Sequence, residues 1–234
     1  MLIDQNKNKS KYLFKGLGII FMYFFISLFK SLPFELMRIN IDDISSYITI
    51  AYNIIIELIM IFIICWVYNN EIKTAIKDIK ENHMTYFKKY FTVYLLGVII
   101  MMLSNIIISK YGGGLSENES AIRSEFQTYP IYTFISAVFL APILEESIFR
   151  MGIKSIFKNK ILYILASGLI FGGLHLIGMP IDKLFPLYLL SYCSEGFAFA
   201  YMMSKTNNVL VPMGFHFMHN GIILSLQTFL LIFT

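Results

Sequence analysis

The chain has 234 residues, of which 57% are apolar, 16% aromatic and 15% charged, and its net charge is +4. Soluble domains average about 45–50% apolar and about 25% charged residues, so this composition favours a protein that lies in lipid. The low charge excludes an intrinsically disordered chain, and the small net charge excludes a nucleic-acid surface. Two cysteines, Cys65 and Cys193, lie inside apolar runs, which argues against a disulfide framework or a CxxC metal site.

The apolar runs predict an all-α polytopic bundle that forms a single membrane domain over residues 1–234. A bilayer core about 30 Å thick needs roughly 20 apolar residues per helix. Seven runs qualify, and they are 12–32, 47–68, 90–109, 130–150, 160–178, 184–204 and 208–233. The first run follows several lysines, as a secretory signal would, but no small-residue cleavage pattern follows it, so we interpret it as a retained span. An eighth span near 30–46 is the alternative.

The basic residues predict the orientation in a cell membrane. Fourteen of the nineteen Lys and Arg residues lie in the N-terminus and near 69–89, 150–160 and 204–208, and five lie in the alternate loops. By the positive-inside rule, the N-terminus is cytoplasmic and the C-terminus is outside.

Two of the loops have distinct compositions. Loop 69–89 is predicted to be a cytoplasmic amphipathic helix with Ile72, Ile76 and Ile79 on one side. Its lysines face water or anionic lipid, and a solvated connecting face is the favoured interpretation. Segment 110–129 contains three consecutive glycines and three glutamates, which predicts a flexible acidic external loop.

Polar residues inside the spans indicate where function lies, because ionisable side chains are costly in lipid. Interhelical hydrogen bonding is the favoured interpretation for four scattered ones, which are Asn53, Glu57, Asn105 and Glu195. The polar residues of the fourth, fifth and seventh spans follow a different pattern.

The fourth span contains two adjacent glutamates, Glu145 and Glu146, whose side chains point about 100° apart on a helix. Glu146 and Arg150 are four residues apart, which predicts a buried structural ion pair. Glu145 then has no local counter-charge and is a candidate general base. Pro142 is expected to free the carbonyl of Val138 and to open the helix beside Glu145.

The fifth span carries His175 on the same helix face as Phe171. Gly168 and Gly172 in this span are expected to permit close approach of a neighbouring helix.

The seventh span carries His216 and Asn220, which are four residues apart and project together, with His219 offset by about 60°. At about 1.5 Å per residue, these groups, Glu145 and His175 reach similar depths near the middle of the bilayer. A carboxylate, two imidazoles and an amide at one depth predict a catalytic or metal site. The amide cannot act as a base, but it donates well to a developing oxyanion.

Three motifs carry a family resemblance, and they are Glu145-Glu146-x-x-x-Arg150, Phe171-x-x-x-His175 and His216-x-x-x-Asn220. In this order and context they resemble the CPBP family, the CAAX-protease and bacteriocin-processing (Abi) membrane proteins. This family includes the type II CAAX prenyl endopeptidases. The resemblance covers residues 130–233, the predicted catalytic core, whereas residues 1–129 form an N-terminal transmembrane region without a recognised motif.

The resemblance implies an intramembrane endopeptidase, a hydrolase whose helices surround a cavity open to the cytosol. Glu145 and His175 would activate the hydrolytic water, and His216 and Asn220 would stabilise the oxyanion. The ion pair of the fourth span would be structural. The implied partners are membrane lipids and a protein or peptide substrate, with a lipid-modified substrate among the candidates.

Several alternatives stay open. A mechanism without a cofactor is favoured, and a zinc site with Glu145, His175 and His216 as ligands is the alternative. Only Glu195 is a further candidate to orient those imidazoles, and His219 has no assigned role. A proton-relay transporter and a non-catalytic bacteriocin-immunity protein are the competing functions.

Overall fold

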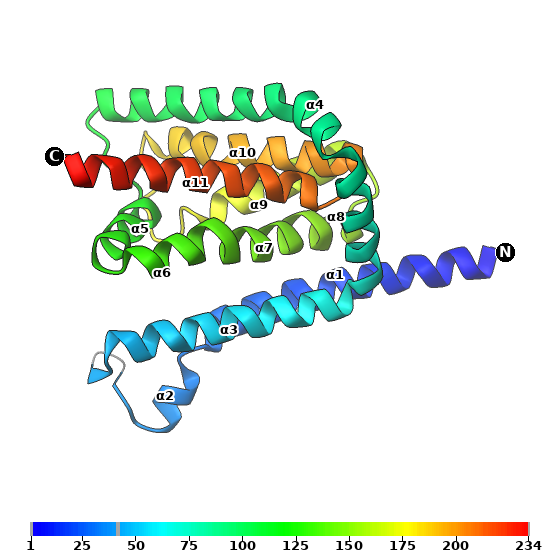
Figure 1. The fold of residues 1–234 in the computed structure, drawn as a ribbon, viewed down its shortest axis with the longest axis horizontal. Helices are drawn as coiled ribbons and strands as arrows, with labels where there is room; N and C mark the ends of the chain where they lie inside the picture. The colour runs from blue at the N-terminus through cyan, green and yellow to red at the C-terminus, as the bar shows by residue number, and fades with distance from the viewer. Residues whose placement is uncertain (1, 41–42, 234) are drawn as a thin grey trace.

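The computed structural model describes residues 2–40 and 43–233, and the described residues form helices and no strands (Figure 1). The first half holds α1 (Leu2–Phe29), α2 (Leu32–Leu36), α3 (Ser46–Val67), α4 (Asn69–Lys110) and α5 (Glu117–Thr128). The second half holds α6 (Pro130–Ile135), η2 (Ser136–Leu140), α7 (Ala141–Glu145), η3 (Glu146–Gly152), α8 (Ile153–Ile156), α9 (Lys160–Leu174), α10 (Phe185–Thr206) and α11 (Leu210–Phe233). The predicted all-α class is confirmed.

Four described segments are long and apolar enough to cross a membrane, and they are Ser10–Phe29, Ser46–Val67, Asn69–Lys110 and Pro130–Ile156. The apolar helix α9 has 15 residues, because it ends at Leu174 and not near residue 178 as predicted. Helices α10 and α11 have 22 and 24 residues, but polar side chains interrupt their apolar sequence. The count of seven spans therefore stays a prediction. In the described part of 30–46, the five-residue helix α2 is too short to be an eighth span.

The predicted loop 69–89 and span 90–109 form one helix, α4, of 42 residues. Such a helix is about 63 Å long, twice the hydrocarbon thickness, so only part of it fits in the bilayer. Figure 1 shows that its first part runs steeply across the end of the bundle before the helix turns along the long axis. Ile72 and Ile79 pack inward on this first part, whereas Ile76 is 40% exposed and does not share their environment.

The first part of α4 is attached to the turn between α10 and α11. The amide of Asn208 donates to Asp78 over 2.7 Å and to the carbonyl of Ala75 over 3.0 Å. Tyr86 also donates to Asp78. These hydrogen bonds to its charged form lower the pKa of the Asp78 carboxyl below its ordinary value.

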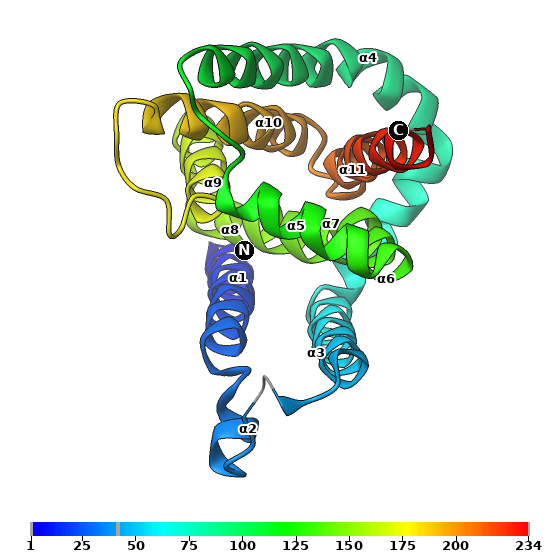
Figure 2. The same cartoon turned by 90° about the vertical axis from the view of Figure 1, so that its left-hand side faces the viewer.

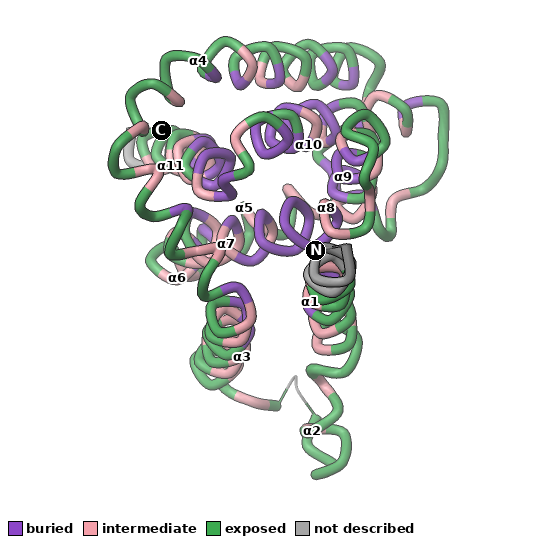
Figure 3. Tube along the Cα trace, turned by 90° about the vertical axis from the view of Figure 1, so that its right-hand side faces the viewer, coloured by how far each residue is buried: buried purple, intermediate pink, exposed green. Residues whose placement is uncertain are grey.

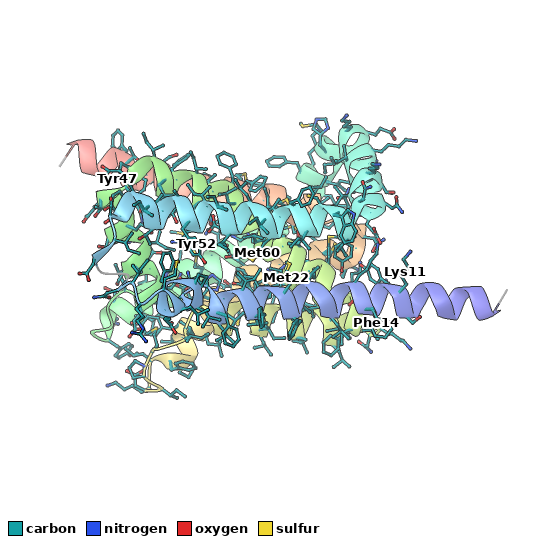
Figure 4. The ribbon with its side chains drawn as sticks, turned by 90° about the horizontal axis from the view of Figure 1, so that it is seen from below. Lys11, Phe14, Met22, Tyr47, Tyr52 and Met60 are labelled. Atoms are coloured by element: carbon teal, nitrogen blue, oxygen red, sulfur yellow. The ribbon has the colours of Figure 1, made fainter. Side chains whose placement is uncertain are left out.

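Helices α4, α9, α10 and α11 and the segment from α6 to α8 form one bundle, and α1 and α3 lie along one side of it (Figures 1 and 2). Figure 3 shows buried residues concentrated in α7–α11 and exposed residues along the outer surfaces of α1, α3 and α4. Met22 and Met60 lie on the inner sides of α1 and α3 (Figure 4), while Phe62 and Trp66 are more than 70% exposed. Apolar outer faces of this kind suit contact with lipid.

Helices α9 and α10 pack at unusually close range through glycines. A Cβ atom on Gly172 would lie 2.5 Å from the sulfur of Cys193, and one on Gly168 would lie 2.1 Å from the ring of Phe197. The predicted close approach of a neighbour at these glycines is confirmed, and the neighbour is α10.

Segment 110–129 is not a flexible loop throughout, because residues 117–128 form α5. The hydroxyl of Ser116 caps this helix by accepting a hydrogen bond from the amide of Glu119. A serine followed three residues later by glutamate is the pattern of a capping box, and this pattern predicts the helix from the sequence.

Candidate active site

Helical geometry changes on both sides of Glu145. The continuous helical segment Pro130–Ile156 contains two π-helices, η2 and η3, which flank the five residues of α7. Glu145 is the last residue of α7, and Glu146 is the first residue of η3. Such π segments within α-helices are frequent at functional sites.

Pro142 and the π geometry together free one carbonyl for the site. In η2 the amide of Ala141 donates to the carbonyl of Ser136, and Pro142 has no amide hydrogen. The carbonyl of Ala137 is therefore available, and the side-chain amide of Asn220 donates to it over 2.7 Å. We expected the freed carbonyl at Val138, and the π-helix moves the side-chain contact one residue earlier.

The predicted structural ion pair is present. Arg150 Nε lies 2.9 Å from Glu146 Oε2, and both side chains are fully buried. Arg150 also donates to the hydroxyl of Ser167 over 2.7 Å, and its guanidinium carbon lies 4.8 Å from the centre of the Phe171 ring. The pair thus has the additional partners that a buried charge needs.

His216 lies between the two glutamates. Its Nδ1 is 3.1 Å from Glu146 Oε1, and its Nε2 is 3.7 Å from Glu145 Oε2. A carboxylate accepts hydrogen bonds, so Nδ1 carries a hydrogen. Glu145 has no cation four residues away on its own helix, as expected, and the imidazole of His216 on α11 is its neighbour across the site.

His175 lies at the C-terminal end of α9 and not inside a helix. Its Nδ1 is 2.8 Å from the carbonyl of Phe171, one of the last carbonyls of the helix. A carbonyl only accepts, so Nδ1 carries the hydrogen and Nε2 keeps its lone pair. The imidazole stacks on the ring of Tyr192, with ring centres 4.9 Å apart. Tyr192 in turn shares a hydrogen bond with the hydroxyl of Ser116.

One cavity of about 680 Å³ brings the predicted residues together. Six Glu, His and Asn side chains of the second half line it, and they are Glu145, His175, Glu195, His216, His219 and Asn220. The Glu145 side chain is 20% exposed, whereas Glu146 and Arg150 are fully buried and outside the cavity lining. The two neighbouring glutamates therefore have different environments, as the sequence predicted.

The cavity reaches one end of the bundle. Its lining includes residues of α5, of the end of α4 around Ile108, and of the second half of α11 at Gln227. Figure 1 shows these parts together at the end opposite the turn between α10 and α11. We call them the α5 end. The positive-inside rule puts this end outside, so the implied cavity open to the cytosol and the predicted orientation contradict each other.

Two further polar contacts line the cavity, and the sequence did not connect their members. Glu195 Oε1 lies 2.9 Å from His219 Nδ1, and Ser191 donates to Asn105 over 3.0 Å. The interhelical hydrogen bonding expected of Asn105 is confirmed by this contact. Glu57 likewise accepts a hydrogen bond from Ser136 over 3.4 Å.

Among the described residues, the alternative zinc ligands share a cavity but do not form a metal-binding group. Glu145, His175 and His216 line the same cavity. Within residues 2–40 and 43–233, however, no three His, Cys, Asp or Glu side chains form a group that could hold a metal ion.

Parts of the sequence match a known protein family and known proteins. Residues 127–222 match the family described as "Type II CAAX prenyl endopeptidase Rce1-like". An uncharacterized protein of Mycoplasma capricolum subsp. capricolum is 28% identical over 233 aligned residues, which cover 88% of this chain and 66% of that protein. A Bacillus subtilis (strain 168) protein named "Putative membrane peptidase YdiL" is 34% identical over 118 residues, 49% of this chain and 45% of that protein. No solved structure matches the chain.

The chain spans 66% and 45% of the lengths of these two relatives. The matched region, residues 127–222, includes the six Glu, His and Asn residues of the second half that line the cavity, and it ends within α11 just after Asn220. Helix α4 lies before the matched region and contributes Asn105 to the cavity lining.

Proposed function

We propose that this chain is an intramembrane endopeptidase of the CAAX-protease type, which hydrolyses a peptide bond with a water molecule activated by Glu145. One observation carries the proposal. Four side chains predicted from three separate helices line a single cavity, and Glu145 is the partly exposed carboxylate among them. The match of residues 127–222 to the Rce1-like family supports a peptidase over a transporter, because that family is one of endopeptidases.

In the proposed first step, Glu145 and His175 share the hydrolytic water. Glu145 takes a proton as the water oxygen attacks the carbonyl carbon of the substrate. The lone pair on His175 Nε2 accepts the second hydrogen of the water, because Nδ1 is committed to the carbonyl of Phe171. The stacking ring of Tyr192 keeps the imidazole in one plane during this step.

His216 and Asn220 are proposed to stabilise the oxyanion. Glu146 occupies Nδ1 of His216, so the protonated imidazole donates to the developing charge through Nε2–H. Asn220 uses one hydrogen of its amide on the carbonyl of Ala137, and the second hydrogen is free to donate. The contact with Ala137 thus orients the amide before substrate binds.

The test compares the membrane peptidomes of cells that carry wild-type protein, Glu145→Gln or Glu81→Gln. Glu81 is an exposed glutamate of α4, so its substitution is the matched control. Cleavage products should be present with wild type and Glu81→Gln and absent with Glu145→Gln. Identical peptidomes in all three strains would contradict the proposal and favour the non-catalytic immunity role.

The proposed topology has seven spans, with the N-terminus in the cytoplasm and the α5 end outside. A reporter fused after Thr234 should be exposed on the outer face, and one inserted near Asn82 should be on the inner face. The physical reason is the concentration of Lys and Arg in the loops on the Asn82 side. A C-terminal reporter on the inner face would overturn this orientation and would leave the cavity open to the cytosol.

The proposed mechanism uses no metal. Purified protein should contain less than one equivalent of zinc, and its peptidase activity should survive chelation. Elemental analysis and activity before and after treatment with a chelator measure this. Stoichiometric zinc, with activity lost on chelation and restored by added zinc, would contradict the mechanism and would assign His175 and His216 as ligands.

A further inference from the structure

A second carboxylate–imidazole pair lines the cavity, and the proposed mechanism does not use it. Glu195 of α10 and His219 of α11 lie 2.9 Å apart, Oε1 to Nδ1. Both residues are buried, with 7% and 8% exposure, and both line the cavity that contains Glu145. Burial of such a pair against a reaction cavity calls for an explanation beyond helix packing.

Two groups face one nitrogen of His219. Glu195 Oε1 lies 2.9 Å from Nδ1, at an ion-pair distance, and the hydroxyl of Tyr94 shares a hydrogen bond with the same nitrogen over 3.3 Å. The Tyr94 ring meets the imidazole edge-on at 6.0 Å between ring centres. Within the described residues, no hydrogen bond occupies Nε2 of His219. A carboxylate that holds Nδ1 of a histidine while Nε2 stays free is the arrangement that orients a histidine for proton transfer.

The reaction proposed above needs such a donor. When the C–N bond of the tetrahedral intermediate breaks, the leaving nitrogen must gain a proton to depart as an amine. Glu145 has taken one proton from water, and the Glu146 pair is outside the cavity lining. His219 is three residues from His216 on α11 and lies on the same cavity.

We propose that His219, in its protonated form, donates the proton that the leaving nitrogen needs, and that Glu195 positions and stabilises it. The C–N electron pair passes to the nitrogen, which takes the proton from Nε2 of His219. The proton that Glu145 received from water then returns the imidazole to its protonated form, which closes the cycle. This inference rests on the proposed peptidase function.

The charged and titratable groups around His219 set the expected pH behaviour. Glu195 faces it from α10, Tyr94 faces it from α4, and His216 precedes it on α11 with Glu145 beyond. Among these groups, Glu195 has the carboxylate beside Nδ1 of His219, so it is the group that stabilises the imidazolium directly.

The experiment measures pH profiles of kcat/KM for the full chain in proteoliposomes, with a fluorescence-quenched farnesylated CAAX peptide as the probe. Wild type should show a bell-shaped profile, whose falling limb at high pH reports the acid. His219→Gln should lose about 10²-fold or more in kcat and should lack this falling limb. Glu195→Gln should lower kcat with little change in KM. His83→Gln removes an exposed histidine of α4 and should leave the profile unchanged.

The outcomes separate this inference from the proposed function. If wild type cleaves the probe only when Glu145 is present, but His219→Gln keeps both the rate and the falling limb, then the inference is overturned. A Glu195→Gln protein with the kcat and KM of wild type would overturn the role of Glu195. Absence of any Glu145-dependent cleavage would instead overturn the peptidase function.

Discussion

Glu145→Gln should abolish cleavage while the protein keeps its wild-type melting temperature and membrane abundance. Glu145 is partly exposed to the cavity, and Nε2 of His216 lies 3.7 Å from its carboxylate. An amide fills the same volume, needs no counter-charge and cannot take a proton from water. Loss of a general base typically reduces the rate by about 10²–10⁴-fold, with a larger loss if the group also positions the water.

Single-turnover cleavage by purified protein and thermal unfolding in detergent measure these two quantities. Glu81→Gln, on the exposed part of α4, controls for the change of charge itself. A Glu145→Gln protein that cleaves at the wild-type rate would remove Glu145 from the mechanism.

Glu146→Gln should destabilise the protein before any effect on chemistry is considered. The change leaves Arg150 charged and without its carboxylate partner in a fully buried position, and it also replaces the charged acceptor of His216 Nδ1 by a neutral one. Breaking a buried ion pair costs about 3–5 kcal/mol. The expected result is therefore a lower melting temperature and less protein in the membrane.

The double change Glu146→Gln with Arg150→Met should recover part of this stability, because no unpaired charge is left. No second change at position 150 should restore cleavage to Glu145→Gln. A stable but inactive Glu146→Gln protein, together with an unstable Glu145→Gln protein, would reverse the roles assigned to the two glutamates.

Much of the site could be predicted because it depends on regular helical spacing. The Glu146–Arg150 pair follows from a separation of four residues, and the close contact of α9 with α10 follows from Gly168 and Gly172. The shared cavity follows from similar depths in antiparallel helices. Each of these inferences needs only local geometry and the thickness of a bilayer.

The remaining features depend on how the helices meet. Pro142 signals an interrupted helix, but the sequence does not specify the register of the π segment. The freed carbonyl, expected at Val138, is therefore that of Ala137, which Asn220 contacts. The position of His216 between two glutamates depends on the rotation of α11 against η3. The early end of α9 places His175 in a helix cap, which a continuous apolar run conceals. The sequence contains a local signal for α5, the capping serine Ser116, but the glycine-rich composition of segment 110–129 favoured a flexible loop in the prediction.

Ser116 gives the α5 end an unexpected mechanical property. Its hydroxyl accepts from the first turn of α5 and also meets the hydroxyl of Tyr192, whose ring supports the imidazole of His175. The first turn of α5 and the ring that stacks on the imidazole of His175 therefore contact one oxygen atom. A peptide that approaches from this end and unwinds the first turn of α5 also releases the ring beneath His175. The order of the first turn of α5 and the orientation of the His175 imidazole are therefore coupled.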